Sequence, residues 1–336
     1  MDLNFQKNLS LRPYNTFGIN VQSKQFIGAK TTEEIQYILR QKKDEKILII
    51  GGGSNLLLTR DFEGLTLRIE SRGIEIIRED KESATVKVAA GENWHQFVLW
   101  CLENNLGGVE NLALIPGSVG AAPIQNIGAY GSELKYVFSS CEAISISNGV
   151  MKTFSKAACQ FSYRNSIFKN ELKGQYVITS VNFLLYKAPH AINDSYKGLN
   201  EKMKGKNKTI QNIAHAVIAI RSEKLPNPEE IGNSGSFFKN PVIPVSQFNA
   251  LQKKFTHIPH YPDSEGKIKV PAAWMIDFLG LKGFRNGDAG VHKNQPLVLV
   301  NYGNASGKAI KALAEKIQSE VDEKFGINLT TEVNII

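Results

Sequence analysis

The sequence contains a stretch of 22 residues, 111–132, that lacks any charged side chain, although 21% of the chain is charged. A membrane-spanning helix is excluded here, because two prolines, four glycines and the polar Gln125 and Asn126 would interrupt both the helix and the apolar surface that a bilayer requires. The glycines at positions 117, 120, 128 and 131 leave the backbone bare. Such a segment is either a buried glycine-rich loop or a surface on which a large flat ligand lies.

Cysteine and histidine give no sign of a disulfide framework or a metal site. The three cysteines, Cys101, Cys141 and Cys159, contain no CxxC pair. His257 and His260 are separated by Ile258-Pro259, which prevents a ligand pair on one helical face, and we expect no metal. The first residues show no basic-then-apolar signal pattern, and the aliphatic runs are strand-sized. We therefore expect a cytoplasmic protein without membrane insertion.

Composition favours a multidomain enzyme. At 336 residues with 42% hydrophobic residues, the chain can bury more than one core. The net charge of +8 indicates either an anionic partner or ordinary lysine-rich solvation. A nucleic-acid surface would place stacking rings among its charges, and the densest lysine cluster has almost none, so we expect no nucleic-acid partner. This lysine cluster comprises Lys197, Lys202, Lys204, Lys206 and Lys208.

Hydrophobic periodicity predicts a mixture of helices and strands that is typical of an α+β protein. Residues 189–224 are expected to form a loop, and Pro226-Asn227-Pro228 marks a hinge. Strands are expected over residues 46–50, 56–58, 65–69, 85–89, 141–147, 175–185, 297–301 and 329–336. Helices are expected over residues 32–41, 94–104, 244–255, 274–279 and 308–325.

A triple glycine, Gly51-Gly52-Gly53, follows the predicted strand 46–50 and precedes Ser54-Asn55. Successive glycines present unobstructed N–H groups that can hold a pyrophosphate, although an ordinary tight turn has the same pattern. A Rossmann fingerprint would need a glycine at position 56 and then a helix. Position 56 is leucine, and residues 57–60 do not begin a helix. The pattern therefore favours a phosphate-binding turn outside a Rossmann fold.

Two bare loops together suggest a bound dinucleotide, and they resemble a known family. Residues 51–55 and 115–131 resemble the FAD-binding half of the UDP-N-acetylenolpyruvoylglucosamine reductase (MurB) family, in its longer subgroup. Residues 161–168, residues 232–241 and Glu332-Val333 match three further motifs of that family in the same order. The resemblance begins at Asn15 and extends to the last predicted strand, so it covers nearly the whole chain.

The resemblance implies a three-domain α+β flavoprotein. Its two-subdomain FAD-binding unit would be like that of vanillyl-alcohol oxidase (PCMH-like), and an α+β domain would bind the substrate. We expect FAD-binding subdomains at residues 1–70 and 71–227, the second completed by 327–336, and a substrate-binding domain at 228–326. The implied enzyme uses NADPH to reduce FAD and then reduces UDP-N-acetylglucosamine enolpyruvate to UDP-N-acetylmuramate in the same cleft. This reaction serves peptidoglycan precursor synthesis, and with it cell-wall biogenesis, cell shape and division.

Three side chains match the catalytic positions of the family. Hydride addition to the enolpyruvyl double bond would accumulate negative charge on the substrate carboxylate. We expect Arg164 to hold that carboxylate and Glu332, if protonated, to donate a hydrogen bond to it. Ser236 would then protonate the enolate at its internal carbon. Each residue alone has an ordinary structural interpretation, and their joint occurrence in family order favours catalysis.

The resemblance also implies two sets of binding residues. For the substrate, Tyr196 would fold over the diphosphate, Lys224 and Asn240 would contact it, and Gln295 would make a further polar contact. The FAD contacts would come from both glycine-rich loops and one cation: Gly51, Gly52, Gly53, Ser54, Asn55, Ile115, Pro116, Gly117, Ser118, Gly120, Gly128, Ala129, Gly131 and Arg221.

Two alternatives remain open from the sequence. One is an oxidase of the same broad flavoprotein fold, although many such oxidases tether the flavin through Cys or His and neither glycine-rich loop contains one. The other is a basic protein that binds nucleic acid or a phosphorylated ligand without catalysis. For the reductase we expect a monomer that meets only small molecules, namely NADPH and the UDP-sugar substrate.

Overall fold

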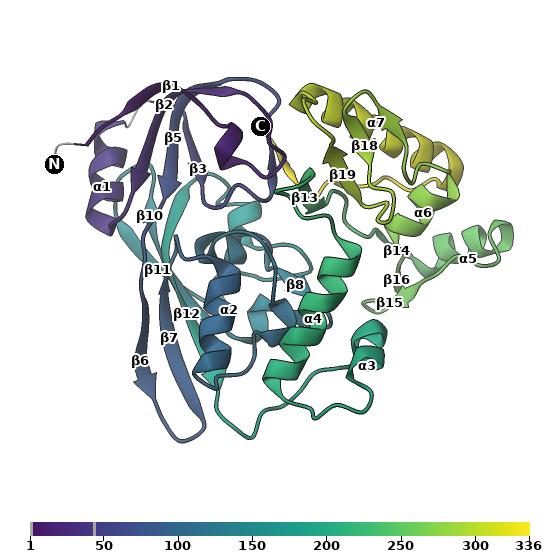
Figure 1. Ribbon diagram of the computed structural model, residues 1–336, viewed down its shortest axis with the longest axis horizontal. Helices are drawn as coiled ribbons and strands as arrows, with labels where there is room; N and C mark the ends of the chain where they lie inside the picture. Colours follow the sequence, from purple (N-terminus) through teal and green to yellow (C-terminus); the bar gives the residue numbers. More distant parts are fainter. Residues whose placement is uncertain (1–2, 43–44) are drawn as a thin grey trace. The chain divides into compact units, whose positions relative to one another are not determined.

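The computed structural model describes residues 3–42 and 45–336 of the chain, with its elements labelled in Figure 1. Two compact units are present, and the chain alternates between them. The triple-glycine motif ends at such a change of unit. Unit 1 comprises Met1–Leu9, Ser23–Gly53 and Phe62–Glu223, and unit 2 comprises Ser10–Gln22, Ser54–Asp61 and Lys224–Ile336. Our three-domain division at residues 1–70, 71–227 with 327–336, and 228–326 stays a prediction.

Unit 1 contains a four-stranded sheet near its N-terminus (Figure 1). The strand order is β1-β2-β5-β3, and both β2 and β3 are parallel to β5. Strand β5 is buried over four consecutive residues, the pattern of a parallel strand that is covered on both faces. The strands are β1 (Gln6–Ser10), β2 (Gln22–Ala29), β3 (Ile47–Ile50) and β5 (Phe62–Ile69), and helix α1 (Thr32–Gln41) lies between β2 and β3 in the chain.

A second sheet of unit 1 has five antiparallel strands in the order β11-β10-β12-β7-β6. The long β12 lies at its centre and pairs with β10 on one side and β7 on the other. Alternate residues of β7 are buried, as expected for a strand with one face on the core. The strands are β6 (Ile74–Glu79), β7 (Ser83–Ala89), β10 (Phe138–Ser145), β11 (Met151–Ser155) and β12 (Tyr176–Tyr186), and a short hairpin is formed by β8 (Gly128–Ala129) and β9 (Ser132–Glu133).

Helix α2 (Trp94–Glu103) anchors the core of unit 1. Its first turn is capped by Asn93, whose side chain accepts the N–H of Gln96. The ring of Phe97 lies 4.7 Å from that of Phe183 on β12. Helix α4 (Ile210–Lys224) runs beside α2 in Figure 1, and Gln211 of α4 donates to the Leu102 carbonyl of α2. A short helix, α3 (Lys197–Met203), precedes α4.

Unit 2 has a sheet of order β13-β19-β18-β17 and a small sheet of order β14-β16-β15. Its helices enclose an aromatic core in which the Trp274 ring lies 5.8 Å from that of Phe325. The elements are β4 (Leu56–Leu57), β13 (Gly232–Ser236), β14 (Val242–Pro244), α5 (Val245–Lys254), β15 (Tyr261–Pro262), β16 (Lys267–Lys269), α6 (Ala272–Phe278), β17 (Arg285–Asn286), β18 (Ala289–Val291), β19 (Val298–Asn301), α7 (Gly307–Phe325) and β20 (Asn334–Ile335).

All five predicted helices are present, and seven of the eight predicted strands match an observed strand along most of their length. The predicted strand 329–336 is mostly wrong, because only β20 and an isolated bridge at Thr331 form there. The predicted loop 189–224 is also wrong, because it contains α3 and α4. Ile210, Ile213 and Val217 are buried at helical spacing in α4, a signal that is present in the sequence and that the loop prediction missed. In the described ranges, no helix is both long and apolar enough to cross a bilayer.

Candidate functional site

The two glycine-rich turns predicted to hold the cofactor pack directly against each other in unit 1. A Cβ atom added to Gly52 would lie 2.9 Å from the Cα of Gly117, and one added to Gly51 would lie 2.0 Å from Oγ of Ser118. Backbone therefore meets backbone at a distance that only glycine allows. Gly117 also has φ +117, a conformation that side chains rarely adopt. These four packed residues, Gly51, Gly52, Gly117 and Ser118, are called the double turn.

The N-terminal end of α2 holds the double turn in place. The N–H of Trp94 donates to the Gly117 carbonyl at 3.0 Å, and the indole Nε1 of Trp94 donates to the Leu112 carbonyl at 2.9 Å. Further along, the Gly120 N–H donates to the Ala90 carbonyl, and a Cβ on Gly120 would lie 2.5 Å from that of Ala90. Hydrogen bonds to its backbone thus hold the uncharged segment in place, so its conformation does not depend on ion pairs.

Leu114 connects this segment to the side chains of His95 and Arg221. Its φ of +58 is unusual for a residue with a branched side chain. Its N–H donates to Nδ1 of His95 at 3.1 Å, and its carbonyl accepts from Nε of Arg221 at 3.2 Å. Burial lowers the pKa of Arg221, with Tyr130 opposing this effect and Arg164 adding to it. Two guanidinium groups therefore lie close enough to repel each other beside an uncharged backbone.

The second half of the uncharged segment is organised around Asn126. A 3-10 helix (Val119–Gln125) ends at Asn126, which is fully buried with φ +46. Its Nδ2 donates to the Ser162 carbonyl at 3.0 Å and to Glu133 at 2.9 Å, and its Oδ1 accepts the Lys135 N–H. These bonds join the predicted cofactor motif to the motif that carries Arg164.

Arg164 lies on this junction. It adopts φ +52 in a turn closed by the paired Ser162 and Asn165. Its Nη2 donates to the Gly128 carbonyl at 2.5 Å, and its guanidinium lies 5.5 Å from the Tyr163 ring centre. A left-handed arginine costs on the order of 1–3 kcal/mol and often marks a functional position. The predicted catalytic arginine is therefore brought onto the backbone of the predicted flavin loop.

Tyr196 is brought to the same loop. Its ring lies 5.1 Å from the Tyr130 ring in an edge-to-face arrangement. Asn111, which is 3% exposed, donates one N–H of its side chain to the Tyr130 carbonyl and the other to the Asn193 carbonyl. Asn193 in turn donates to the Gly131 carbonyl. The segment that carries Tyr196 is thus fastened to the glycine-rich loop three residues before the tyrosine.

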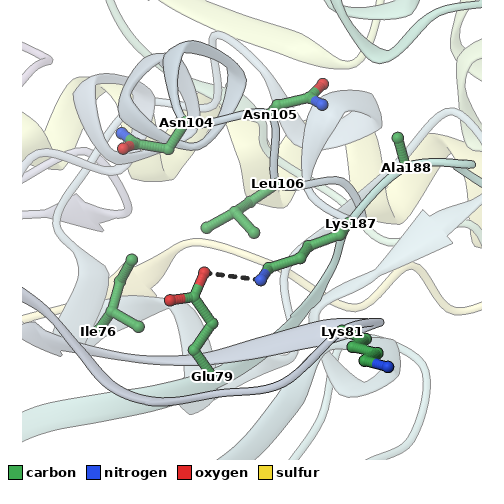
Figure 2. Close-up of a pocket in the computed structure, with 8 residues that line it drawn as sticks. All are labelled: Ile76, Glu79, Lys81, Asn104, Asn105, Leu106, Lys187 and Ala188. Atoms are coloured by element: carbon green, nitrogen blue, oxygen red, sulfur yellow. Dashed lines mark ion pairs between the residues drawn. The ribbon is translucent and has the colours of Figure 1, made fainter.

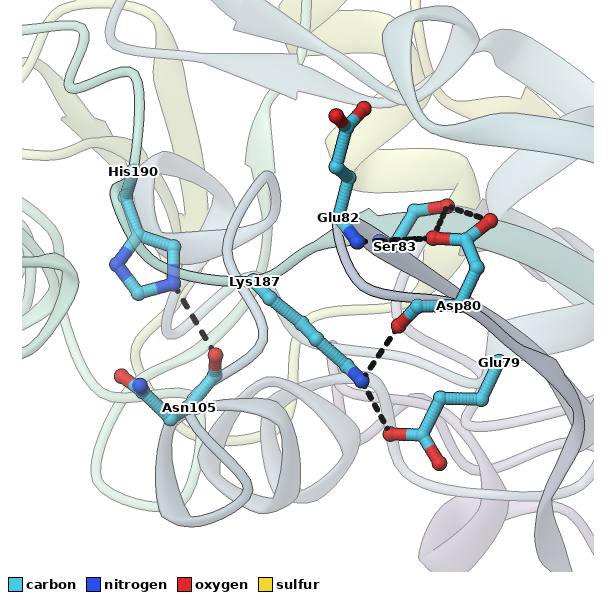
Figure 3. Close-up of polar contacts among 7 residues, drawn as sticks. All are labelled: Glu79, Asp80, Glu82, Ser83, Asn105, Lys187 and His190. Atoms are coloured by element: carbon cyan, nitrogen blue, oxygen red, sulfur yellow. Dashed lines mark hydrogen bonds and ion pairs between the residues drawn. The ribbon is translucent and has the colours of Figure 1, made fainter.

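The start of this segment is fastened at the far end of β12. Lys187 forms an ion pair with Glu79 at 2.8 Å and donates to the Asp80 carbonyl at 2.7 Å, and His190 bonds the Asn105 carbonyl (Figure 3). An open groove of about 380 Å³ lies here, with Lys187 and Glu79 in its wall (Figure 2). None of the predicted cofactor or substrate residues lines this groove. The contacts of Lys187 and His190 fix the position at which the segment leaves β12.

The lysine cluster is partly neutralised by its neighbours. Lys208 forms an ion pair with Asp194 at 2.7 Å, and Lys202 forms one with Glu223 on α4 at 2.6 Å. The first of these pairs joins the residues just before α3 to those just after it. Two of the five lysines thus hold the Tyr196 segment. Their ion pairs reduce the positive charge that the cluster presents to an anionic ligand.

In unit 2, Ser236 and Glu332 lie on neighbouring stretches of backbone. The N–H of Glu332 donates to the carbonyl of Phe237, the residue after Ser236, at 2.8 Å, and the next residue, Phe238, forms a bridge with Thr331. Gly235 precedes Ser236 with φ +69, and its N–H is held by the side chain of Asn233. Two of the predicted catalytic residues are therefore aligned by one antiparallel pairing.

The other predicted residues of unit 2 are more dispersed. Asn55 donates to the Glu332 carbonyl at 3.4 Å, so it joins the Ser236 and Glu332 pair. Asn240 accepts the N–H of Ala272 at the start of α6. Gln295 accepts the N–H of Val298 through its backbone, and Lys224 is exposed at the end of α4. No hydrogen bond or ion pair in the described ranges joins Asn240, Gln295 and Lys224 to one another.

The double turn and its surroundings fit a dinucleotide. Gly52 and Pro116 are exposed, so bare backbone is accessible on the double turn and beside it. No carboxylate forms an ion pair with Arg221 within residues 3–42 and 45–336. A half-buried, repelled guanidinium beside unobstructed backbone favours an anionic ligand, and the uncharged surface suits a flat ring.

Sequence reasoning missed His95, Asn111 and Asn193. Asn111 belongs to the uncharged segment, and its position among apolar residues was an available signal for a buried amide. His95 and Asn193 lie outside every motif, and only the folded chain reveals their contacts with Leu114 and Gly131.

Comparison with known proteins first defines a class. Residues 23–155 match the family model described as FAD binding domain, and residues 227–336 match the model described as UDP-N-acetylenolpyruvoylglucosamine reductase, C-terminal domain. The chain is therefore a flavoprotein with an FAD-binding domain. This confirms the predicted α+β flavoprotein fold.

Full-length relatives then define the family. A UDP-N-acetylenolpyruvoylglucosamine reductase of Flavobacterium johnsoniae is 52% identical over 337 residues, which cover 99% of this chain and 100% of the relative. One of Amoebophilus asiaticus is 48% identical and covers 100% of both chains. The crystal structure of the reductase (MurB) from Thermus caldophilus has the same fold, with a TM-score of 0.69, 22% identity and coverage of 100% of this chain and 99% of that one. The chain belongs to the UDP-N-acetylenolpyruvoylglucosamine reductase family, as the sequence motifs predicted.

Proposed function

We propose that the protein is an FAD-dependent reductase that uses NADPH to convert UDP-N-acetylglucosamine enolpyruvate to UDP-N-acetylmuramate in peptidoglycan precursor synthesis. Membership of the family over the full chain supports the substrate. The observation that carries the proposal is the contact between Arg164 and the Gly128 carbonyl, because it joins a carboxylate-binding side chain to the loop of an FAD-binding domain. FAD, when bound, supplies hydride transfer between NADPH and the substrate.

The chain would hold FAD through exposed backbone and one half-buried cation, Arg221. Gly51 to Asn55 would contact it on one turn, and Arg221 would supply positive charge. On the other turn the contacts would be Ile115, Pro116, Gly117, Ser118, Gly120, Gly128, Ala129 and Gly131. Since the structure fixes Gly51 and Gly52 against Gly117 and Ser118, a dinucleotide that touches one turn would also touch the other.

Arg164 and Glu332 would act on the substrate carboxylate. A guanidinium is planar and binds a carboxylate through two parallel hydrogen bonds, so Arg164 suits the site where negative charge develops. Its bond to the Gly128 carbonyl limits its orientation before substrate binds. Glu332, in its protonated form, would donate a further hydrogen bond to the same oxygens.

Ser236 would deliver the proton that completes the product. A serine hydroxyl is a weak acid, so it needs the charge stabilisation that Arg164 and Glu332 supply. The pairing of Glu332 with Phe237 supports a common role for Ser236 and Glu332, because it sets the spacing between them. Tyr196, Lys224, Asn240 and Gln295 would contact the diphosphate and uridine portions of the substrate.

Product analysis tests this function. The purified protein should show flavin absorption, or gain it on addition of FAD, and should form UDP-N-acetylmuramate from NADPH and the enolpyruvyl substrate, detectable by mass spectrometry. Oxygen consumption under the same conditions should be slow, which separates a reductase from an oxidase. A protein that never binds FAD would instead support the non-catalytic binding alternative.

The proposal also covers the location of the protein, its oligomeric state and its partners. We propose a cytoplasmic monomer whose partners are NADPH and the UDP-sugar, with no nucleic-acid partner. Light scattering of the flavin-loaded protein tests the monomer, and a mass twice that of one chain would contradict it.

A further inference from the structure

His95 lies at the N-terminal end of α2 and fastens the segment that precedes the double turn. Its Nδ1 accepts the N–H of Leu114 at 3.1 Å. A ring nitrogen can accept a hydrogen bond only when it carries no proton, so this contact requires a neutral imidazole with its proton on Nε2. The bond is therefore one that protonation would break.

Leu114 has a backbone conformation that depends on these hydrogen bonds. It is held at φ +58, a conformation that costs a branched residue free energy and persists only when its surroundings impose it. His95 binds its N–H and Arg221 binds its carbonyl, so the peptide groups on both sides of the strained residue are fixed. Two residues later the chain reaches Pro116 and the double turn.

The neighbouring fastenings do not respond to pH. Trp94 binds the Gly117 and Leu112 carbonyls through its backbone and indole N–H groups, neither of which titrates near neutrality. The charge that acts on His95 is Arg221 of α4, which itself faces Tyr130 and Arg164. Protonation of His95 would thus remove an acceptor and add a cation beside the Arg221 guanidinium.

We propose that His95 is a positioning residue for the flavin site, whose neutral imidazole holds Leu114 in its left-handed conformation and thereby makes FAD affinity depend on pH. The inference rests on the proposed function only in taking FAD as the ligand of the double turn. His95 acts through Leu114.

The direction of the pH dependence follows from the environment of the imidazole. Burial, with Arg221 adding to it, lowers the pKa of His95 in the folded protein below its ordinary value of 6.5. The folded state thus favours the neutral ring, and its stabilising contribution is complete above pH 6.5. The contribution is lost as pH falls from 6.5 through the lowered pKa. FAD affinity should fall as pH drops through the lowered pKa of His95 in the folded apoprotein, because the protonated ring cannot accept the Leu114 N–H.

Binding of FAD to the apoprotein, followed by flavin fluorescence from about pH 8 to about pH 5, tests the proposal. The wild type should bind FAD roughly tenfold more weakly at the acidic end, the size expected from one hydrogen bond. His95→Asn places an amide oxygen near the position of Nδ1, so it should bind like the wild type near pH 8 and show no acidic loss. His95→Phe removes the acceptor and should bind roughly tenfold more weakly at every pH.

His215→Asn is the matched control, because His215 is exposed on α4, and this variant should follow the wild type at every pH. An acidic loss that persists in His95→Asn, or a wild type without any loss, would overturn the proposal. Circular dichroism of the apoproteins identifies any variant that fails to fold, and the two substitutions at His95 are judged independently. A wild type that binds no FAD at any pH contradicts the proposed function instead, so the two failures are distinguishable.

Discussion

The double turn of unit 1 and the Ser236 and Glu332 pair of unit 2 present different kinds of chemistry. The double turn offers backbone, packed so closely that a Cβ on Gly52 would lie 2.9 Å from Gly117. Unit 2 offers side chains, aligned by the bond from Glu332 to Phe237. Backbone determines where a cofactor can lie, whereas side chains move protons. Changes to the double turn should therefore impair FAD binding, and changes in unit 2 should leave FAD bound and slow one half-reaction.

Ser236→Ala should give the largest effect and the clearest separation. Loss of a proton donor slows a reaction by roughly 10²–10⁴-fold, so reoxidation of the reduced flavin by the enolpyruvyl substrate should slow by this factor. Reduction by NADPH should be unchanged, because it needs no proton from Ser236. Rapid-mixing absorbance measurements of each half-reaction check this, with Ser264→Ala, an exposed serine of unit 2, as the control. Equal slowing of both half-reactions would remove the role assigned to Ser236.

Arg164→Lys tests a side chain that belongs to the flavin loop. A lysine keeps the charge but cannot form the two parallel bonds of a guanidinium, and we expect turnover to fall by about 10²–10³-fold. FAD should remain bound, because the loop is held by Asn126 and α2 as well as by Arg164. Steady-state kinetics with a flavin count per protein chain measures both, and Arg78→Lys on the exposed face of β6 is the control. Turnover near that of the wild type would contradict the carboxylate clamp.

Alanine at the two glycines of the double turn should separate backbone contact from side-chain contact. Gly52→Ala would collide with the Gly117 backbone, and we expect a cost of about 3 kcal/mol in the free energy of unfolding and weakened FAD binding. Gly51→Ala would collide only with the Ser118 side chain, at a cost of about 2 kcal/mol. Urea unfolding of the apoproteins and FAD titration measure these effects.

The double variant Gly51→Ala with Ser118→Gly is the sharper test of this packing. Removal of the Ser118 side chain should restore stability to within about 1 kcal/mol of the wild type, the cost of an added glycine. The same Ser118→Gly change should not rescue Gly52→Ala, because Gly52 faces backbone. Rescue of both variants, or of neither, would show that the two turns do not meet as described.

Asp80→Asn should have the smallest effect. Asp80 accepts the N–H groups of Glu82 and Ser83 in the turn between β6 and β7, which lower the pKa of its exposed carboxyl below the ordinary value of 3.8 (Figure 3). The stabilising contribution of this carboxylate is present above pH 3.8 and is lost as pH falls through the lowered pKa. Thermal unfolding should show a small deficit of the variant at neutral pH that disappears in acid, with FAD affinity unchanged.

Much of the fold was predictable because local patterns agreed with the tertiary structure. Thr31 and Asn93 cap α1 and α2 where the periodicity begins, so both helices start at the predicted residue. Helix α4 was not predicted because apolar residues such as Ile218 and Ala219 also lie outside the buried stripe of Ile210, Ile213 and Val217, which weakens the helical periodicity. The last strand was over-extended because its partner, β4, has only two residues.

The parts of the site that belong to a sequence motif were predictable, and the parts outside any motif were not. The glycines at 51, 52 and 117 are needed for close backbone contact, and such a need leaves a visible pattern in the sequence. His95 and Asn193 were not predictable, since their roles depend on which carbonyl or N–H the fold brings near them. The substrate contacts of Lys224, Asn240 and Gln295 remain predictions, because single polar side chains carry no such pattern.

The central claim, that this chain passes hydride from its flavin to an enolpyruvyl UDP-sugar, is tested most directly by mixing the reduced enzyme with that substrate without oxygen. Absorbance of the oxidised flavin should return in a single rapid phase whose rate depends on substrate concentration, and UDP-N-acetylmuramate should form in an amount equal to the flavin reoxidised. A reduced flavin that persists with the UDP substrate and is reoxidised only by oxygen would contradict the account.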